Sequence, residues 1–327
     1  MRNKIVRRES PAPVGVVGLG LMGSSIAACL LAAGHPVAGI EKSAGRRKSV
    51  KRHILALLRE MRKEKLLKRD PAPLVRNLTV SEDYGALGDC ALVVEAIYED
   101  LDTKRGVLRK IEESVAPDAL IGSNTSALPV TELQKGALRP ERILGIHWAE
   151  PAHITRFMEI ICGNQTDPAN ADQVARMAER WQKEPTLVRR DVRGFITNRI
   201  MYAMLREAFY LVEAGYATPA DVDRSLRNDL GYWITMAGPF RFMDLTGIPA
   251  YAAVMRDLLP ELCRDTQVPA LMKKVVESGA RGTANAKGFY DYTPAQAKRW
   301  EKRFLQFSYD IRALALKYAE RPQGSRS

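Results

Sequence analysis

The sequence is poor in cysteine, in histidine and in long apolar runs. Its 327 residues include only four histidines and four cysteines, which are Cys29, Cys90, Cys162 and Cys263. The cysteines are far apart and form no CxxC pair, so we predict neither a disulfide framework nor a bound metal. Three of them lie in or beside apolar segments, as buried thiols do in a reducing compartment. We therefore expect a cytoplasmic protein.

No apolar run approaches the roughly 18 residues that a membrane span needs. The first residues, MRNKIVRRESPAP, are basic but lack the apolar core of a secretory signal. We therefore predict no membrane association. With 46% hydrophobic and 27% charged residues, the composition is that of a globular protein, and the length suits two domains.

The chain carries a formal net charge of +12, and many of its basic residues gather in the stretch 46–69. The same stretch has an apolar stripe with helical spacing (Ile54, Leu57, Leu58 and Met61), which predicts an amphipathic helix. A solvated helix face, a surface for a phosphate-bearing cosubstrate and a nucleic-acid surface are the three interpretations. No nucleic-acid motif or interleaved aromatic residues support the third, so we predict no nucleic-acid partner.

Short apolar runs alternate with helical patterns over the first 190 residues. The runs at 14–17, 37–40, 92–95, 120–123, 143–147 and 157–161 are the predicted strands, and 185–190 is a candidate edge strand. This alternation predicts an α/β fold with a doubly wound, mostly parallel sheet of the Rossmann type. Only helical patterns follow, so we expect a first domain at 1–192, an all-helical domain at 193–315 and a disordered tail at 316–327.

A glycine fingerprint, GLGLMG, stands between the first strand and the first helix, with Gly18, Gly20 and Gly23 in GxGxxG spacing. Such a turn lets the backbone approach a pyrophosphate, which then lies at the helix N-terminus. Glu41 ends the second strand, 18 residues after Gly23. A carboxylate at this point binds the ribose hydroxyls and repels a 2′-phosphate, which favours NAD over NADP, although Arg46 and Arg47 nearby keep NADP open.

His147 and Glu159 are twelve residues apart, near the ends of two predicted strands joined by a short loop. A histidine whose imidazole is held by a carboxylate is a general base. With a nicotinamide cofactor, such a pair predicts removal of a hydroxyl proton while hydride leaves the carbon. A histidine that only satisfies the core is the alternative interpretation.

Seven segments occur in the order found in short-chain L-3-hydroxyacyl-CoA dehydrogenases. They are GLGLMG, VVEAIYEDLDTK, SNTSALPVTEL, GIHWAEP with MEII, GFITNRI, GPFRFMDLTG and KGFYDY. The chain resembles this family over roughly residues 13–292. The family includes enzymes of fatty-acyl and hydroxybutyryl thioesters, and relatives that act on carnitine or gulonate. The resemblance implies a small-molecule substrate, most simply an acyl-CoA, and a homodimer formed through the helical domain, which also contacts substrate.

The resemblance also implies residue roles. His147 matches the catalytic base, Glu159 the carboxylate that orients it, and Ser126 and Asn198 polar groups of the catalytic centre. The glycine turn with Leu21 and Met22, Glu41, Glu99 and Lys104 matches the cofactor site. The basic segment matches a helical hairpin that receives the CoA nucleotide, so the resemblance makes Lys48, Lys51 and Arg52 candidate phosphate contacts.

Two of the residues that follow His147, namely Ala149 and Glu150, depart from the family pattern. Where these enzymes commonly have an aromatic pair followed by Asn-Pro, this chain has Trp148, Ala149 and Glu150 before a proline. A Glu150 carboxylate that faces the site would disfavour an anionic acyl group, which weighs against a plain fatty-acyl-CoA and admits a polar or cationic substrate. A CoA-free hydroxy acid of the carnitine or gulonate kind is the alternative substrate.

Three further alternatives remain. The opening GLGLMGSSIAACLLAAGHPV also resembles β-hydroxyacid dehydrogenases, but the helix that carries their catalytic lysine has an asparagine here. A structural NAD-binding protein of the crystallin kind would keep the fold but would not need the polar residues Ser126, His147, Glu159 and Asn198. A basic nucleic-acid binder is the third alternative.

Overall fold

A computed structural model describes residues 11–319, and the chain divides into two units, 1–199 and 200–327. The boundary falls inside a helix, α7 (Thr197–Glu213). Residues 320–327, which hold most of the predicted disordered tail, lie outside the described part. Residues 316–318 were also assigned to that tail, but they belong to the last helix, α13 (Pro294–Tyr318).

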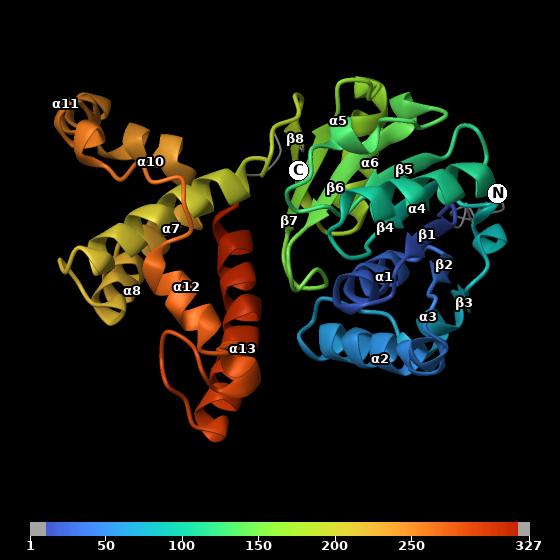
Figure 1. The fold of residues 1–327 in the computed structure, drawn as a ribbon. Helices are drawn as coiled ribbons and strands as arrows, with labels where there is room; N and C mark the ends of the chain where they lie inside the picture. Colours follow the sequence, from blue (N-terminus) through green and yellow to red (C-terminus); the bar gives the residue numbers. More distant parts are fainter. Residues whose placement is uncertain (1–10, 320–327) are drawn as a thin grey trace, which may run out of the picture. The chain divides into compact units, whose positions relative to one another are not determined.

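The first unit is built on one eight-stranded sheet (Figure 1) in the order β3-β2-β1-β4-β5-β6-β7-β8. Every neighbouring pair is parallel except β6 and β7, which are antiparallel. The strands are β1 (Val14–Val17), β2 (Val37–Ile40), β3 (Leu78–Ser81), β4 (Leu92–Glu95), β5 (Leu120–Ser123), β6 (Ile143–Trp148), β7 (Phe157–Cys162) and β8 (Glu184–Val188).

Helices cover both faces of this sheet. One buried cluster joins it to α1 (Leu21–Ala33), α2 (Ala44–Lys63), α3 (Pro71–Arg76) and α6 (Pro168–Arg180). A second cluster joins the opposite face to α4 (Leu101–Ser114) and α5 (Val130–Leu133). The doubly wound, mostly parallel sheet predicted from the sequence is confirmed. Strand β3 was missed because LTVS is a run of only four residues, of which Leu78 alone is buried.

The strand order reverses at β1, which pairs with β2 on one side and β4 on the other. In open α/β sheets, ligands bind in the crevice outside the carboxyl ends of the strands at this point. The glycine turn follows β1 directly, so it lies at the reversal.

The predicted basic hairpin has arms of unequal length. Helix α2 spans 20 residues and buries the predicted apolar positions Ile54, Leu58 and Met61. It ends at Lys63, and Lys65 adopts a positive φ of 63° where the chain turns back. The returning helix α3 has only six residues, because Pro71 begins it and β3 follows closely.

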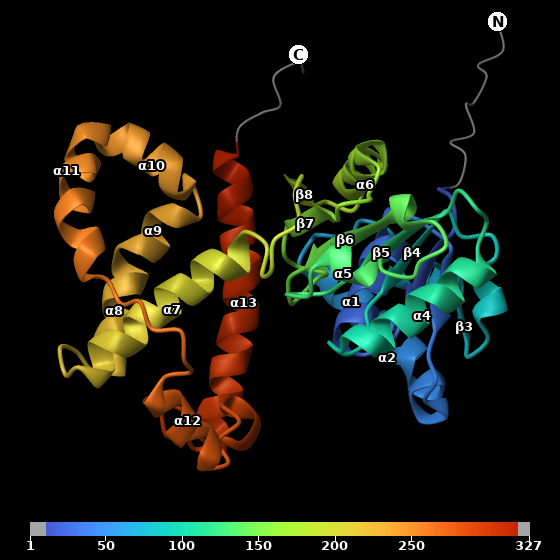
Figure 2. The same ribbon diagram turned by 45° about the horizontal axis from the view of Figure 1, so that its top comes forward.

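The second unit is helical in its described residues, apart from isolated bridges formed by Lys287 with Gly282 and Asp291. Its helices are the rest of α7, α8 (Pro219–Asn228), α9 (Leu230–Ile234), α10 (Gly238–Thr246), α11 (Ile248–Leu258), α12 (Ala270–Glu277) and the 25-residue α13 (Figure 2). Thr218 caps α8 through a reciprocal capping box with Asp221.

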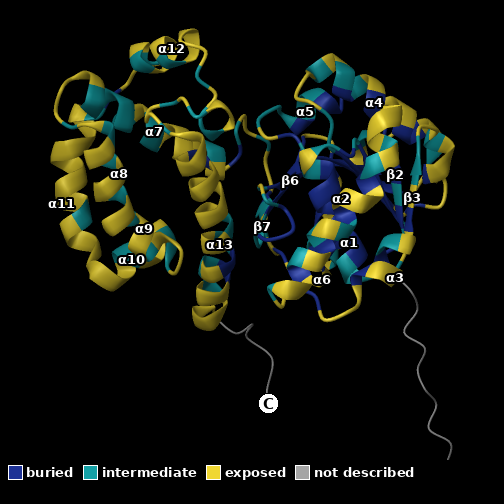
Figure 3. Cartoon of the chain, turned by 90° about the horizontal axis from the view of Figure 1, so that it is seen from below, coloured by how far each residue is buried: buried dark blue, intermediate teal, exposed yellow. Residues whose placement is uncertain are grey.

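The two units differ in how far they bury their residues. The strands and inner helix faces of the first unit are buried, whereas most of the second unit is exposed or intermediate (Figure 3). Helices α7 to α12 contain no buried residue. None of the described helices has the length and apolar character to cross a membrane.

Candidate active site

The glycine turn has the geometry of a phosphate cradle. Gly18 has a φ of +89°, a conformation that favours glycine, and a Cβ on Gly23 would lie 1.7 Å from the Gly18 carbonyl oxygen. The third glycine is therefore required for α1 to pack against the turn. A Cβ on Gly20 would meet nothing within 4 Å, so the helix N-terminus is open to a ligand there. Leu21, which is 64% exposed, and Met22 begin α1 at this opening.

Glu41 lies against this turn, just beyond the end of β2. Its Oε2 accepts a hydrogen bond from the Leu19 backbone N–H (3.1 Å), and its Oε1 accepts one from Ser43 (2.9 Å). Burial raises the pKa of the carboxyl, but hydrogen bonds from Ser43, Arg46 and Leu19 outweigh it, so the pKa is below its ordinary value. Glu41 is therefore ionised at neutral pH beside the glycine turn, which fits an adenosine ribose.

His147 and Glu159 stand directly opposite each other in the antiparallel β6–β7 pair. Opposite residues of such a pair project to the same face, so the side chains meet without help from the connecting loop. The His147 Nδ1 lies 2.9 Å from the Glu159 Oε2. The rings of Phe157 and Phe195 approach the imidazole, with centroids 5.3 and 5.7 Å away.

Glu159 is almost completely buried, with 1% of its surface exposed. Its second oxygen, Oε1, accepts hydrogen bonds from the backbone N–H groups of Ile196 (3.1 Å) and Thr197 (2.9 Å), at the start of α7. Burial raises the pKa of this carboxyl, but the hydrogen bonds from His147 and the helix amides lower it by more. A buried carboxylate thus stays ionised next to the imidazole of His147.

Ser126 follows β5 in a loop that Glu99 holds in place. One oxygen of Glu99 accepts hydrogen bonds from the Thr125 hydroxyl (2.5 Å) and from the backbone N–H groups of Ser126 (2.9 Å) and Ala127 (3.2 Å). The Asn198 amide donates to the Ser126 carbonyl oxygen (2.7 Å). The structure therefore brings the Asn198 side chain to the backbone of Ser126.

Lys104 differs from its expected position in the cofactor site. Its side chain is completely buried, and the ammonium lies 2.8 Å from the Glu95 carboxylate and 3.3 Å from that of Glu99. A side chain enclosed in this way offers a cofactor no surface in this structure. Glu99 is 38% exposed and remains accessible. The expected direct contact from Lys104 is replaced here by support of the Glu99 side chain.

Glu150 and His153 lie in the loop between β6 and β7. Glu150 is exposed, and its side chain has no hydrogen bond or ion pair within the described residues. His153 is buried, with its Nδ1 2.8 Å from the Ser25 hydroxyl of α1, so it serves the packing of the loop.

Comparison with known proteins identifies the family of this chain. Residues 13–192 match the NAD binding domain of 3-hydroxyacyl-CoA dehydrogenase, and residues 194–292 match the C-terminal domain of the same enzyme. The chain belongs to the 3-hydroxyacyl-CoA dehydrogenase family. It is accordingly an NAD-dependent oxidoreductase that acts on CH–OH groups.

Relatives within this family differ in their substrates. The chain is 32% identical over 287 residues to 5-formyl-3-hydroxy-2-methylpyridine 4-carboxylate 5-dehydrogenase of Mesorhizobium japonicum, covering 87% of this chain and 92% of the relative. It is also 32% identical over 286 residues to 3-hydroxybutyryl-CoA dehydrogenase of Mycobacterium tuberculosis, covering 85% and 98%.

The chain is also similar to solved structures of enzymes of both kinds. A crystal structure of the pyridine carboxylate dehydrogenase superposes with a TM-score of 0.86 at 27% identity, covering 93% of this chain and 98% of the other. The structure of (S)-3-hydroxybutyryl-CoA dehydrogenase from Ralstonia eutropha gives 0.72 at 28% identity, covering 86% and 99%.

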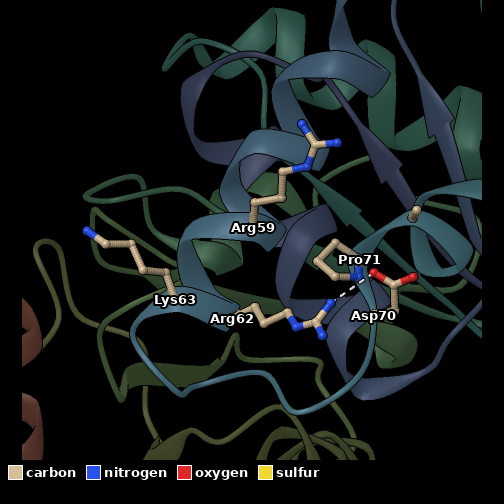
Figure 4. Close-up of a pocket in the computed structure, with 6 residues that line it drawn as sticks. Arg59, Arg62, Lys63, Asp70 and Pro71 are labelled. Carbon is tan, nitrogen blue, oxygen red and sulfur yellow. Dashed lines mark hydrogen bonds and ion pairs between the residues drawn. The ribbon is translucent and has the colours of Figure 1, made fainter.

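The basic segment of this family member forms a hollow at the end of α2. A space of about 450 Å³ is lined by Arg59, Arg62, Lys63, Asp70, Pro71 and Ala72. Arg62 turns its guanidinium toward Asp70 (3.0 Å), while Arg59 and Lys63 extend in other directions (Figure 4). The expected phosphate contacts Lys48, Lys51 and Arg52 are exposed on the preceding turns of α2 and do not line this hollow.

Two residues of this site were not singled out from the sequence. Glu95 is a fully buried carboxylate at the end of β4, and its oxygens accept hydrogen bonds from Lys104 and from the Ser123 hydroxyl (2.6 Å). A glutamate at the end of an apolar strand could have indicated a buried ion pair, because a buried carboxylate needs a partner. Phe195 is buried beside His147 at a positive φ of 53°, which no sequence pattern indicates.

Proposed function

We propose that the protein oxidises a secondary alcohol, most simply L-3-hydroxyacyl-CoA to 3-oxoacyl-CoA, with His147 as the general base. The observation that carries this proposal is the buried pair of His147 Nδ1 and Glu159 Oε2, 2.9 Å apart. Because Glu159 engages Nδ1, the other ring nitrogen is left to take the substrate hydroxyl proton. NAD, when bound, accepts the hydride that leaves the carbinol carbon.

Glu159 stays ionised and stabilises the imidazolium that forms, an electrostatic role that does not require it to take the proton. Ser126 and Asn198 hold the substrate oxygen as it becomes a carbonyl. Glu99, which holds the Ser126 backbone, sets the position of this hydroxyl and lies at the cofactor side of the loop.

The cofactor would lie across the strand-order reversal. Gly18, Gly20, Leu21, Met22 and Gly23 would hold the pyrophosphate at the α1 N-terminus. Glu41 would bind the adenosine ribose, and Glu99 the ribose next to the nicotinamide.

An acyl-CoA brings several phosphate groups, which the basic face of α2 suits. Lys48, Lys51 and Arg52 are exposed cations on this helix, and Arg59 and Lys63 line the hollow at its end. Anionic phosphates are attracted to such a face, so these residues support the thioester interpretation of the net positive charge.

A CoA-free hydroxy acid or related alcohol is the second candidate substrate. Two observations favour it: the exposed Glu150 carboxylate, which no ion pair neutralises in the described chain and which would attract a cationic group such as that of carnitine, and the TM-score of 0.86 to a dehydrogenase of a pyridine carboxylate. In this case Ala149 and Glu150 would select the substrate in place of a CoA-binding surface.

We also propose a homodimer formed through the second unit, in a reducing compartment such as the cytoplasm. Trp300, Phe304, Phe307, Leu314 and Tyr318 follow one face of α13 at spacings of four, three, seven and four residues and are each 49–62% exposed. Half-exposed side chains of this size present about 100 Å² each, or roughly 500 Å² together, against the ~800 Å² per partner of a standard interface. Sedimentation of wild type and of Phe304→Glu tests this, with a monomeric wild type refuting it.

The first experiment is NADH formation by the purified protein with L-3-hydroxybutyryl-CoA, L-3-hydroxybutyrate, L-carnitine and L-gulonate. Turnover of the thioester that is lost in His147→Ala, with NADH binding retained, is expected. Turnover of a CoA-free acid alone would keep the base and overturn the acyl-CoA substrate. Tight NADH binding without turnover of any compound would favour a structural NAD-binding protein, and salt-sensitive binding of DNA would revive the nucleic-acid interpretation.

A further inference from the structure

Two arginines stand beside Glu41, the residue expected to bind the adenosine ribose. The Arg46 guanidinium lies 3.0 Å from the Glu41 Oε2. Arg47 donates to the backbone oxygens of Glu41 (2.9 Å) and Lys42 (2.7 Å) and pairs with Glu82 (2.8 Å). Both arginines are in the first turn of α2, so the helix N-terminus adds its own positive end to the same place.

The two arginines differ in how they are held. Arg47 is fixed from three sides and is only 23% exposed, so its guanidinium is ordered without any ligand. Arg46 is half exposed, and Glu41 supplies the one carboxylate that it contacts among residues 11–319. If that carboxylate is removed, Arg46 loses its partner and becomes available to another anion.

We propose that Glu41 alone makes this protein choose NAD, and that Arg46 and Arg47 already form a latent site for the 2′-phosphate of NADP. In dinucleotide-binding sheets, an acidic residue at the end of the second strand binds the ribose 2′-hydroxyl, whereas a nearby arginine accommodates a 2′-phosphate. This chain has both elements, and the carboxylate occupies the arginine.

The charges explain why the wild-type protein excludes the phosphate. A 2′-phosphate would meet the Glu41 carboxylate at hydrogen-bonding range, and like charges at that range are disfavoured. Glu41 cannot turn aside easily, because Leu19 and Ser43 hold both of its oxygens. After loss of the carboxylate, Arg46 has no carboxylate partner among the described residues, whereas Arg47 keeps its contact with Glu82 (2.8 Å). Two guanidinium groups and the positive end of α2 then remain near the 2′-phosphate.

The test compares Glu41→Ser, which removes the carboxylate, with Glu41→Gln, which keeps its length and one acceptor oxygen. Calorimetry would measure the Kd of NADH and NADPH, and of 5′-AMP and 2′,5′-ADP as fragments that differ only by the 2′-phosphate. These readouts need no alcohol substrate, so they are independent of the proposed reaction. We expect NADPH and 2′,5′-ADP to bind about 10- to 100-fold tighter to both variants than to wild type, the range of one charge-assisted hydrogen bond.

A second substitution in the Glu41→Ser background assigns the phosphate contacts. Arg46→Ala and Arg47→Ala are each expected to reverse most of the gain. Arg76→Ala is the matched control, because Arg76 is an exposed arginine before the amino end of β3, whereas Glu41 follows the carboxyl end of the parallel neighbouring strand β2. It should leave the affinity for 2′,5′-ADP unchanged.

Two results would overturn the proposal. One is NADPH binding no tighter in Glu41→Ser and Glu41→Gln than in wild type, with both variants still folded by their melting curves. The other is a loss of 2′,5′-ADP affinity in Arg76→Ala as large as in Arg46→Ala, which would reduce the effect to overall charge. Failure here would leave NAD-dependent oxidation through His147 untouched.

Discussion

Replacing Glu159 by glutamine should slow the reaction strongly without weakening cofactor binding. The substitution keeps the size of the side chain, and the glutamine oxygen can still accept hydrogen bonds from Ile196 and Thr197 as the glutamate Oε1 does. The amide nitrogen then faces the His147 Nδ1. Because this nitrogen donates, it forces the ring proton onto the other nitrogen, the one that has to receive the substrate proton.

The size of the effect follows from the geometry. With Nδ1 and Oε2 2.9 Å apart, the charges of the imidazolium and the carboxylate are centred about 4 Å from each other. At an effective dielectric of about 20, this interaction amounts to about 4 kcal/mol. Its loss from the transition state slows the chemical step by roughly a thousandfold, and the wrong tautomer adds to this.

The assay is steady-state NADH formation together with NADH binding. Glu159→Gln should lower kcat about a thousandfold, with the Kd of NADH and the KM of the alcohol close to wild type. Glu179→Gln, the same chemical change on the exposed face of α6, is the control. A fall in kcat of less than about tenfold, or one shared by Glu179→Gln, would refute the electrostatic role of Glu159.

Four further outcomes are expected. Lys104→Met should destabilise the protein by about 3–5 kcal/mol in urea unfolding, because it leaves a buried carboxylate unpaired, and the double variant with Glu95→Gln should recover part of this. A stable Lys104→Met that loses only NADH affinity would instead favour a direct cofactor contact. Gly23→Ala should abolish NADH binding, since its Cβ would lie 1.7 Å from a backbone oxygen; unaltered binding contradicts the packing argument. Burial, then the neighbouring Asp89, raises the pKa of Cys90 to about 11, so the native protein should not react with iodoacetamide at this thiol at pH 8 or so. Burial raises the pKa of Glu99, but the Thr125 hydroxyl and Lys104 lower it by more, so the folded-state pKa lies below the ordinary value of 4.5. The stability that this carboxylate contributes should therefore be lost as the pH falls from 4.5 through the folded-state value. The melting temperature of Glu99→Gln should accordingly fall less between neutral and acidic pH than that of wild type.

The first half of the fold was predictable because its signals are local. A glycine fingerprint, a strand before it and a helix after it require only neighbouring residues. The same holds for α2, whose apolar stripe predicted its buried face, although the stripe did not show that Lys63 ends the helix.

The candidate site was predictable in its residue types but not in its connections. The sequence pointed to His147, Glu159, Ser126 and Asn198, all of which the structure describes in the first unit. It did not show that two amides at the start of α7 hold Glu159, or that Glu99 holds the Ser126 loop. These contacts join residues 27 to 38 positions apart, and no periodicity reports on them.

By itself, the sequence determined the α/β class, the nucleotide turn, the carboxylate after β2 and the two members of the histidine–glutamate pair. Only the tertiary structure decided that β6 and β7 run antiparallel, which puts that pair face to face, and that Lys104 is enclosed rather than available to a cofactor. The physical reason is that local patterns depend on propensity and burial along one segment. Strand direction and the partner of a buried charge depend on which distant segments the folded chain brings together.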